Sequence, residues 1–309
     1  MKILVTYDIP REPFTNLPAD WELTFPAGEK FDKEELLKIL PGYDIMLSIF
    51  SRPIDKDMID AGKNLKLISN YGVGFNNIDI RYAREKGITV CNTPDSVCNP
   101  TAELCMALLL SAARRIAEMD RRIRVEKESM WGVMKNLGFG LAGKTLGIVG
   151  MGRIGQNVAQ KAQAFGMNII YYNRKSDVPG YRRTDLDTLL KQSDFISLHT
   201  PLTDETRHLI GERELSLMKK NAILINTARG PVIDEEALTR CLREKRIAGA
   251  ALDVFEREPH ITEALYSLDN VTLIPHVGTA TIDGRIAMAE EALGNIRNFL
   301  NGTPTNVVN

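Results

Sequence analysis

A glycine-rich segment in the middle of the chain constrains the fold more than any other feature of the sequence. It reads Leu146-Gly-Ile-Val-Gly150-Met-Gly152-Arg-Ile-Gly155, follows an apolar stretch directly and opens an amphipathic one. In the dinucleotide-binding fingerprint, the first glycine permits a tight turn, the second lets the backbone approach a pyrophosphate, and the third packs the helix against the strand. We therefore predict that these glycines bind the phosphates of a dinucleotide at the N-terminus of a helix.

The second half of the chain continues this alternation of short apolar stretches and amphipathic ones. Six predicted strands separated by helices match the number and spacing of strands in a doubly wound dinucleotide-binding sheet. The predicted strands are Thr145–Val149, Asn168–Tyr172, Phe195–Leu198, Ala222–Asn226, Gly249–Leu252 and Val271–Ile274.

The first hundred residues show the same rhythm without a glycine fingerprint. Strands that alternate with helices pair in parallel through crossover connections, so this region is predicted to form a second α/β sandwich. The predicted strands are Ile3–Thr6, Ile45–Ile49, Leu65–Ser69 and Thr89–Cys91, and the helices between them are Lys33–Leu40, Lys56–Ala61 and Ile80–Lys86.

Two helices mark the predicted domain boundaries. After Asn92-Thr-Pro-Asp95, a buried helix is expected to start with Asn99 as its N-cap and Pro100 in its first turn. The last amphipathic helix, about Ala280 to Leu300, is followed by no strand of its own. It must therefore pack on a domain that is built from earlier residues.

Composition excludes several classes of partner. A length of 309 residues favours two domains, and a net charge of −1 gives no reason to expect nucleic acid or a membrane surface. The first residues are too short an apolar run for a signal peptide, and residues 104–110 fall well short of a membrane span. None of the four cysteines lies at a metal-ligand spacing, so we expect no metal. Cys91 and Cys105 lie in apolar stretches where buried free thiols are common, so we expect a cytoplasmic protein.

Three later segments each follow a predicted strand and carry charged or titratable side chains. They place Arg229, Asp253, Glu258 and His276 after strand ends, where doubly wound sheets bind their ligands. Together these residues supply a cation for a carboxylate, an acid–base group and a carboxylate that tunes it. This set suits hydride-transfer chemistry.

At these residues the chain resembles the D-isomer-specific 2-hydroxyacid dehydrogenases. The resemblance spans nearly the whole chain and includes Asn70–Asp79, Asn92-Thr-Pro, Thr101-Ala-Glu103-Leu and His199-Thr200-Pro201. It implies two doubly wound parallel-sheet α/β domains: a Rossmann dinucleotide-binding domain (99–282) inserted into a flavodoxin-like substrate domain (1–98 plus 283–309). It also implies a homodimer in which the region around 118–140 embraces the partner.

The resemblance further implies roles for individual residues. Arg229 binds the substrate carboxylate and polarises the keto oxygen, His276 protonates that oxygen as hydride arrives, and Glu258 stabilises the imidazolium. The backbone amides of Val73 and Gly74 hold the second face of the carboxylate. The residues expected around the cofactor are Thr101, Gly150, Gly152, Arg153, Ile154, Gly155, Asn173, Arg174, Lys175, Thr200, Pro201, Thr227, Asp253, His276 and Gly278.

The end of the second strand of the dinucleotide domain bears on the choice of cofactor. NAD recognition normally uses an Asp or Glu there, which accepts hydrogen bonds from the ribose hydroxyls. This chain has the neutral Asn173 followed by the cations Arg174 and Lys175. We therefore expect NADP to be the preferred cofactor, with use of both NADP and NAD as the alternative.

Three functions stay open on the sequence alone. Ile49 and Phe50 make the expected substrate pocket apolar, which favours small unphosphorylated 2-keto acids such as glyoxylate or hydroxypyruvate. A 3-phosphoglycerate dehydrogenase would have cations where Ile49 and Ser51 stand, although Arg52 lies close by. A nucleotide-sensing, corepressor-like binding protein is the third, disfavoured because no extra interaction segment is visible.

Overall fold

In the computed structural model, residues 1–49, 52–128 and 130–309 are described. The chain divides into two compact units, Met1–Val97 with Thr279–Asn309, and Cys98–Gly278. We call them the outer unit and the inserted unit, because the second interrupts the sequence of the first. Each is built on a parallel sheet, as the sequence predicted.

The outer unit contains a five-stranded sheet in the order β2-β1-β3-β4-β5, with every pair parallel. This is the flavodoxin-like strand order. The strands are β1 (Lys2–Val5), β2 (Glu22–Thr24), β3 (Ile45–Ile49), β4 (Leu67–Tyr71) and β5 (Thr89–Cys91), and the helices between them are α1 (Lys33–Ile39), α2 (Lys56–Ala61) and α3 (Ile80–Glu85).

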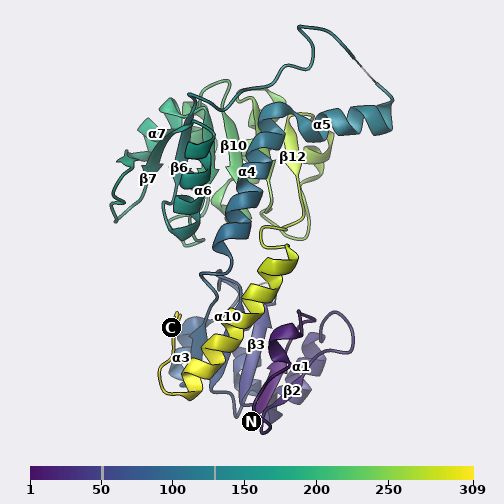
Figure 1. Ribbon diagram of the computed structural model, residues 1–309, viewed down its shortest axis with the longest axis vertical. Coiled ribbons are helices and arrows are strands. Elements are labelled where there is room, and N and C mark those ends of the chain that lie inside the picture. Colours follow the sequence, from purple (N-terminus) through teal and green to yellow (C-terminus); the bar gives the residue numbers. More distant parts are fainter. Residues whose placement is uncertain (50–51, 129) are drawn as a thin grey trace. The chain divides into compact units, whose positions relative to one another are not determined.

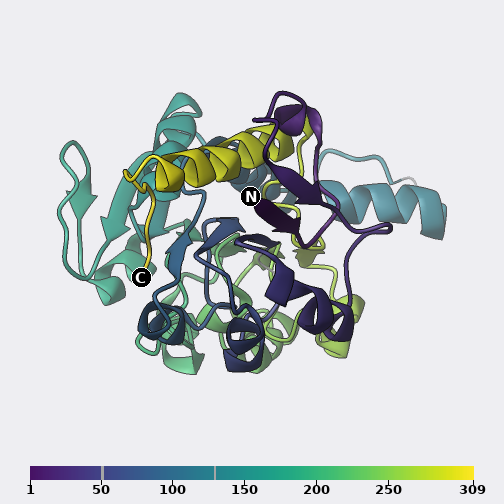
Figure 2. The ribbon, with the colours of Figure 1, turned by 90° about the horizontal axis from the view of Figure 1, so that it is seen from below.

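Alternate residues of these strands face opposite sides of the sheet, as the two-residue period of a strand requires. On one face, Leu4, Met46 and Ile68 belong to a core that includes residues of α1, α2 and α3. On the other, Ile3 and its neighbours pack with Ile296 of the terminal helix α10 (Ile282–Leu300). Figure 2 shows α10, in yellow, on the opposite side of these strands from the dark-blue helices. The helix that lacked a strand of its own thus covers the first sheet.

The inserted unit contains a seven-stranded parallel sheet in the order β12-β11-β10-β9-β6-β7-β8. Counted from β6, this is the dinucleotide-binding order 3-2-1-4-5-6 with one more strand at its end. The strands are β6 (Thr145–Val149), β7 (Asn168–Tyr172), β8 (Arg182–Arg183), β9 (Phe195–Leu198), β10 (Ile223–Asn226), β11 (Gly249–Leu252) and β12 (Val271–Leu273).

Helices cover both faces of this second sheet. Residues of α4 (Cys98–Arg114) and α6 (Arg153–Ala164) form one core with the sheet, and those helices pack side by side (Figure 1). Residues of α7 (Leu186–Gln192), α8 (Glu212–Leu217) and α9 (Glu235–Arg243) form the other. No helix of the described residues is both long and apolar enough to cross a membrane.

The predicted start of α4 was wrong. The helix begins at Cys98, so Asn99 lies within its first turn and is not its N-cap. The Asn99 side chain instead donates a hydrogen bond to Glu103 (2.6 Å) and accepts one from Lys161 of α6 (2.8 Å). Asn99 therefore helps to join α4 to α6.

Candidate active site

The predicted ligand edge of the inserted unit is built by strands whose last residues pair across the sheet. These residues are Leu273, Leu252, Asn226, Leu198, Val149 and Tyr172, in spatial order. The residues that follow them share one edge because the strands are parallel. This edge carries His276, Asp253, Thr227, Thr200 with Pro201, Gly150 and Asn173.

The glycine loop has the conformation and the close packing that a dinucleotide requires. Gly150 has a φ of 97°, and a Cβ on it would lie 2.8 Å from the carbonyl of His199. A Cβ on Gly155 would lie 2.3 Å from the Gly150 carbonyl oxygen. A Cβ on Gly152, the N-cap of α6, would meet nothing within 4 Å. Backbone and helix terminus are thus open to phosphate oxygens, with Arg153 and Ile154 as the first residues of the helix.

Two polar atoms just after β9, on this edge, are buried without a hydrogen-bond partner among the described residues. They are the hydroxyl of Thr200 and the Nδ1 of His199. Burial lowers the pKa of His199 to about 3, so its imidazole is neutral, and its Nε2 bonds the Ser197 hydroxyl at 2.7 Å. Because buried polar atoms are costly when unpaired, these atoms fit a site that a polar ligand completes.

Thr101, Asp253 and Gly278 come together at the β11 end of this edge. A Cβ on Gly278 would lie 3.1 Å from Asp253 Oδ2 and 3.7 Å from the side chain of Thr101. Asp253 is buried, and its Oδ1 accepts a hydrogen bond from the Val277 amide at 2.6 Å. Burial raises the pKa of this carboxyl, although the Val277 amide and His276 act in the opposite direction.

His276 and Glu258 form a direct pair. The Nδ1 of His276 lies 2.8 Å from Oε2 of Glu258, whose Oε1 accepts the Phe255 amide at 3.0 Å. Burial by itself raises the pKa of Glu258, but the hydrogen bond and charge of His276, the Phe255 amide and the charge of Arg229 bring it below its usual value. His276 has a φ of 49°, a rare conformation for a residue other than glycine, and its amide donates to Asp253 O at 2.8 Å.

Arg229 lies in the turn after β10, next to the loop that carries Glu258. A Cβ on Gly230 would lie 1.9 Å from the Phe255 carbonyl, so only glycine allows this approach. The guanidinium is half-buried and donates to Ala228 O at 2.6 Å. Burial lowers the pKa of Arg229 and the charge of Glu258 opposes this effect, yet an arginine remains protonated at any working pH.

The remaining predicted residues of the substrate site lie in the outer unit. Val73 and Gly74 are in the loop that follows β4, and Ile49 is the buried last residue of β3. Phe50 and Ser51 lie outside the described residues. The guanidinium of Arg52 donates to the Phe31 carbonyl, so it already has a structural role.

Asn173 contacts the glycine loop directly. Its Oδ1 accepts the Met151 amide at 2.7 Å, and its Nδ2 lies 3.2 Å from the carbonyl and the hydroxyl of Ser176. Arg174 forms an exposed ion pair with Glu205, at 3.4 Å. Arg183, which the sequence did not single out, donates to the carbonyls of Asn173 (2.7 Å) and Arg174. It comes from the two-residue strand β8, which has no apolar pattern that could reveal it.

No group of three or more His, Cys, Asp or Glu residues in the described ranges is arranged to hold a metal ion. The four cysteines are free thiols, and Cys91, Cys105 and Cys241 are buried.

Residues 106–278 match the family described as D-isomer specific 2-hydroxyacid dehydrogenase, NAD binding domain. The chain is also 46% identical over 319 aligned positions to a glyoxylate reductase of Thermococcus litoralis, covering 100% of this chain and 96% of the relative. The chain belongs to this family. The predicted membership and fold class are confirmed, and this dehydrogenase is a nicotinamide-dependent oxidoreductase.

Solved structures agree along the whole length of the dehydrogenase. The TT0316 protein of Thermus thermophilus superimposes with a TM-score of 0.94 at 41% identity, covering 100% of both chains. An NADPH-dependent glyoxylate/hydroxypyruvate reductase of Sinorhizobium meliloti, solved with NADP and malonate, gives a TM-score of 0.88 at 30% identity, covering 99% of this chain and 96% of that one.

Proposed function

We propose that this dehydrogenase reduces small, unphosphorylated 2-keto acids of the glyoxylate and hydroxypyruvate type to D-2-hydroxy acids. The observation that carries the proposal is the His276–Glu258 pair, 2.8 Å apart, on the same sheet edge as the glycine loop. Such a pair supplies a proton donor whose charged form is stabilised. The names of the glyoxylate reductases described above support this substrate class.

The proposed mechanism divides the work among three side chains and one loop. The nicotinamide, when bound, supplies the hydride. Arg229 binds the substrate carboxylate and polarises the keto oxygen, while the amides of Val73 and Gly74 take the second face of the carboxylate. His276 donates a proton to the keto oxygen from Nε2, and Glu258, on Nδ1, stabilises the imidazolium beforehand.

The cofactor contacts are proposed on the same basis. Backbone amides of the loop from Gly150 to Gly155 would hold the pyrophosphate, with Arg153, Ile154, Thr200 and Pro201 beside it and Thr101, Thr227, Asp253 and Gly278 toward the nicotinamide. We assign residues 99–282 as the dinucleotide-binding domain and 1–98 plus 283–309 as the substrate domain.

The substrate panel tests both the activity and the class of acid. We expect glyoxylate or hydroxypyruvate to oxidise the reduced cofactor, measured at 340 nm, with a higher kcat/KM than 3-phosphohydroxypyruvate. The reason is that Ile49 is apolar and offers no partner to a phosphate dianion, while one N–H of Arg52 is already bonded to the Phe31 carbonyl. A preference for the phosphorylated acid would contradict the assignment. If none of the 2-keto acids caused oxidation of the cofactor, a nucleotide-sensing binding protein would be favoured instead.

We further propose a preference for NADPH over NADH. Asn173 adds no negative charge that would repel a 2′-phosphate, and Arg174 and Lys175 bring two cations to the same strand end. The kcat/KM values should differ at least tenfold, about 1.4 kcal/mol, which is modest for one charge-assisted contact. The double variant Asn173→Asp with Arg174→Ala should move the preference toward NADH, because a carboxylate accepts hydrogen bonds from the ribose hydroxyls and repels a 2′-phosphate. The aspartate also keeps an oxygen that can accept the Met151 amide.

Arg182→Ala is the matched control for this cofactor switch, because Arg182 is an exposed arginine of the neighbouring strand β8. It should leave the preference unchanged. If the wild type used NADH at least as well as NADPH, the interpretation of Asn173 to Lys175 would be wrong while the reaction class would stand.

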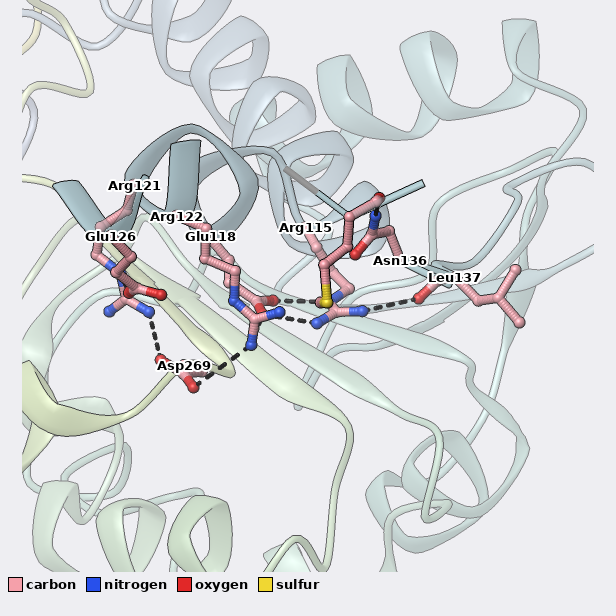
Figure 3. A network of polar contacts seen from close by, with 9 residues as sticks. Arg115, Glu118, Arg121, Arg122, Glu126, Asn136, Leu137 and Asp269 are labelled. Atoms are coloured by element: carbon pink, nitrogen blue, oxygen red, sulfur yellow. Dashed lines mark hydrogen bonds and ion pairs between the residues drawn. The ribbon is translucent and has the colours of Figure 1, made fainter. Parts of the chain in front are cut away.

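A homodimer is the proposed assembly. After α4, a segment formed by α5 (Ile116–Arg121) and the π-helical turn Arg122–Glu126 projects from its sheet (Figure 1). At its base, Arg115 and Arg122 pair with Glu118, and Arg121 pairs with Asp269 (Figure 3). Beyond this base, Val125, Trp131 and Val133 are 72%, 89% and 92% exposed.

Exposed apolar surface of this kind marks an interaction site, and the family resemblance makes a second copy its partner. Sedimentation equilibrium should therefore give twice the chain mass of 34.5 kDa. Replacing both Val125 and Val133 by Glu should shift the mass toward the monomer. A wild-type protein that is monomeric at micromolar concentration would refute the assembly.

A further inference from the structure

The loop after β4 is held in the outer unit through its carbonyl oxygens. Asn70 donates from Nδ2 to the carbonyls of Gly72 (3.0 Å) and Gly74 (2.9 Å). Asn92 donates from its own Nδ2 to the carbonyl of Val73 at 2.8 Å. The amide of Thr93 adds a second bond to Gly72 O, at 3.2 Å. Three consecutive carbonyls therefore point toward buried amide donors.

This arrangement fixes where the amides of the loop point. In a trans peptide the N–H is directed opposite to the C=O of the same plane. The bond from Asn70 to Gly72 O therefore sets the direction of the Val73 N–H, and the bond from Asn92 to Val73 O sets that of the Gly74 N–H. Neither amide donates to another described residue. The N–H groups of Val73 and Gly74 therefore point away from the buried amide donors. Successive backbone N–H groups directed to one side form a concavity that binds anions.

Asn92 is itself fixed by the terminal helix, far away in the sequence. Asn295 of α10 donates from Nδ2 to the Asn92 carbonyl at 2.8 Å, and the Asn92 amide donates to Asn306 O at 3.1 Å. The Oδ1 of Asn295 accepts from Thr305 (3.2 Å) and Asn306 (3.1 Å). Asn295 is 1% exposed and Asn92 is 7% exposed.

Burial of two amide side chains is unfavourable unless every polar atom is paired, and an apolar residue would pack against the sheet without this requirement. The chain of bonds runs from the tail through Asn295 and Asn92 to the Val73 carbonyl. Its end point is a peptide plane whose other side is the Gly74 N–H. The network thus controls the orientation of one hydrogen-bond donor.

We propose that Asn92, held by Asn295, is a positioning residue that aims the Gly74 amide at the carboxylate of the substrate. The inference rests on the proposed function for the nature of the anion. It adds that the affinity for the keto acid is set partly by an asparagine on the terminal helix, which touches neither substrate nor cofactor. When the Gly74 N–H is no longer held in this orientation, carboxylate binding weakens, while the dinucleotide site in the other unit is unchanged.

The test measures glyoxylate binding by calorimetry to protein saturated with oxidised NADP, a complex in which no hydride is available, together with KM and kcat for reduction. Asn92→Ala should weaken glyoxylate binding and raise its KM about tenfold, as expected for one charge-assisted hydrogen bond. The Kd of NADPH should not change. Asn295→Ala should have a smaller effect in the same direction.

The double variant separates positioning from general loosening. Because Asn295 acts through Asn92, the pair of substitutions should bind glyoxylate no more weakly than Asn92→Ala alone. Ser69→Ala is the matched control: its buried hydroxyl also joins the sheet to α10, at Ala292 O (2.9 Å), but does not touch the loop. It should keep the wild-type binding constant. If Asn92→Ala does not fold, Asn92→Asp keeps the size and should bind glyoxylate still more weakly, since two acceptors then face each other.

Wild-type affinity in Asn92→Ala, or an equal loss in Ser69→Ala, would overturn the proposal, and additive losses in the double variant would overturn the role of Asn295. A wild type that binds glyoxylate without reducing it would refute the proposed function alone, because the binding constants of the variants still decide the inference. A wild type that does not bind glyoxylate would overturn both.

Discussion

His276→Ala is expected to lower kcat for glyoxylate reduction by at least about two orders of magnitude, the usual contribution of a positioned general acid. The keto oxygen gains negative charge as the carbon is reduced, so it needs a proton donor. Among the described residues, His276 is the only histidine on this sheet edge whose ring nitrogen is paired with a carboxylate. Steady-state kinetics at 340 nm, with the Kd of NADPH measured in parallel, will separate loss of chemistry from loss of cofactor.

His208→Ala is an unusually close control. His208 also pairs with a glutamate at 2.8 Å, Glu256, and also has a positive φ, of 51°, but it lies in the loop that contacts Pro231 and is exposed. It should retain nearly full activity. Nearly full activity in His276→Ala would instead exclude this histidine as the proton donor.

Glu258→Gln should cost less activity and should change the pH profile. The pKa of Glu258 lies below its usual value, so the side chain is a carboxylate across the working range and favours the protonated imidazole beside it. Glutamine removes that charge, so the imidazolium beside it loses its stabilising partner. The alkaline limb of the reduction profile should therefore move toward acid. An unchanged profile would show that Glu258 does not tune the donor.

The strands that the sequence predicted well are those with continuous apolar runs. Both faces of β6, β9 and β10 are covered by helices, so nearly every residue is apolar and the run is visible without knowledge of the fold. Two strands, β2 and β8, were not predicted because they lack a continuous apolar run. Glu22–Thr24 is a short edge strand with an exposed first residue, and Arg182–Arg183 consists of two exposed arginines.

The site was predictable to a similar degree and for a similar reason. Parallel strands bring their carboxyl ends to one edge, so residues that follow strand ends could be grouped from the sequence alone. Hydrogen bonds between distant loops and helices could not be predicted in this way. Asn92 and Asn295 are 203 positions apart and are joined only because α10 packs on the first sheet. The second role of Asn173, as an acceptor for the Met151 amide, likewise depends on the exact turn of the glycine loop.

Arg229→Ala is expected to lower kcat/KM for glyoxylate by at least about two orders of magnitude, because one side chain is proposed both to bind the carboxylate and to stabilise charge on the keto oxygen. The turn that carries it is fixed by the contact of Gly230 with the Phe255 carbonyl and by the bond from Asn226 to Arg229 O, at 3.0 Å. The backbone should therefore keep its shape in the variant, and the Kd of NADPH should remain close to the wild-type value.

Arg229→Lys tests the geometry of the contact as well as its charge. Lysine keeps the cation but lacks the planar fork that binds a carboxylate through two parallel bonds, so it should recover only part of the lost kcat/KM. Arg240→Ala, which removes an exposed arginine of α9 paired with Glu212, should leave kinetics unchanged. Full recovery with lysine would mean that charge alone is needed at this position, and wild-type kinetics in Arg229→Ala would remove this residue from the mechanism.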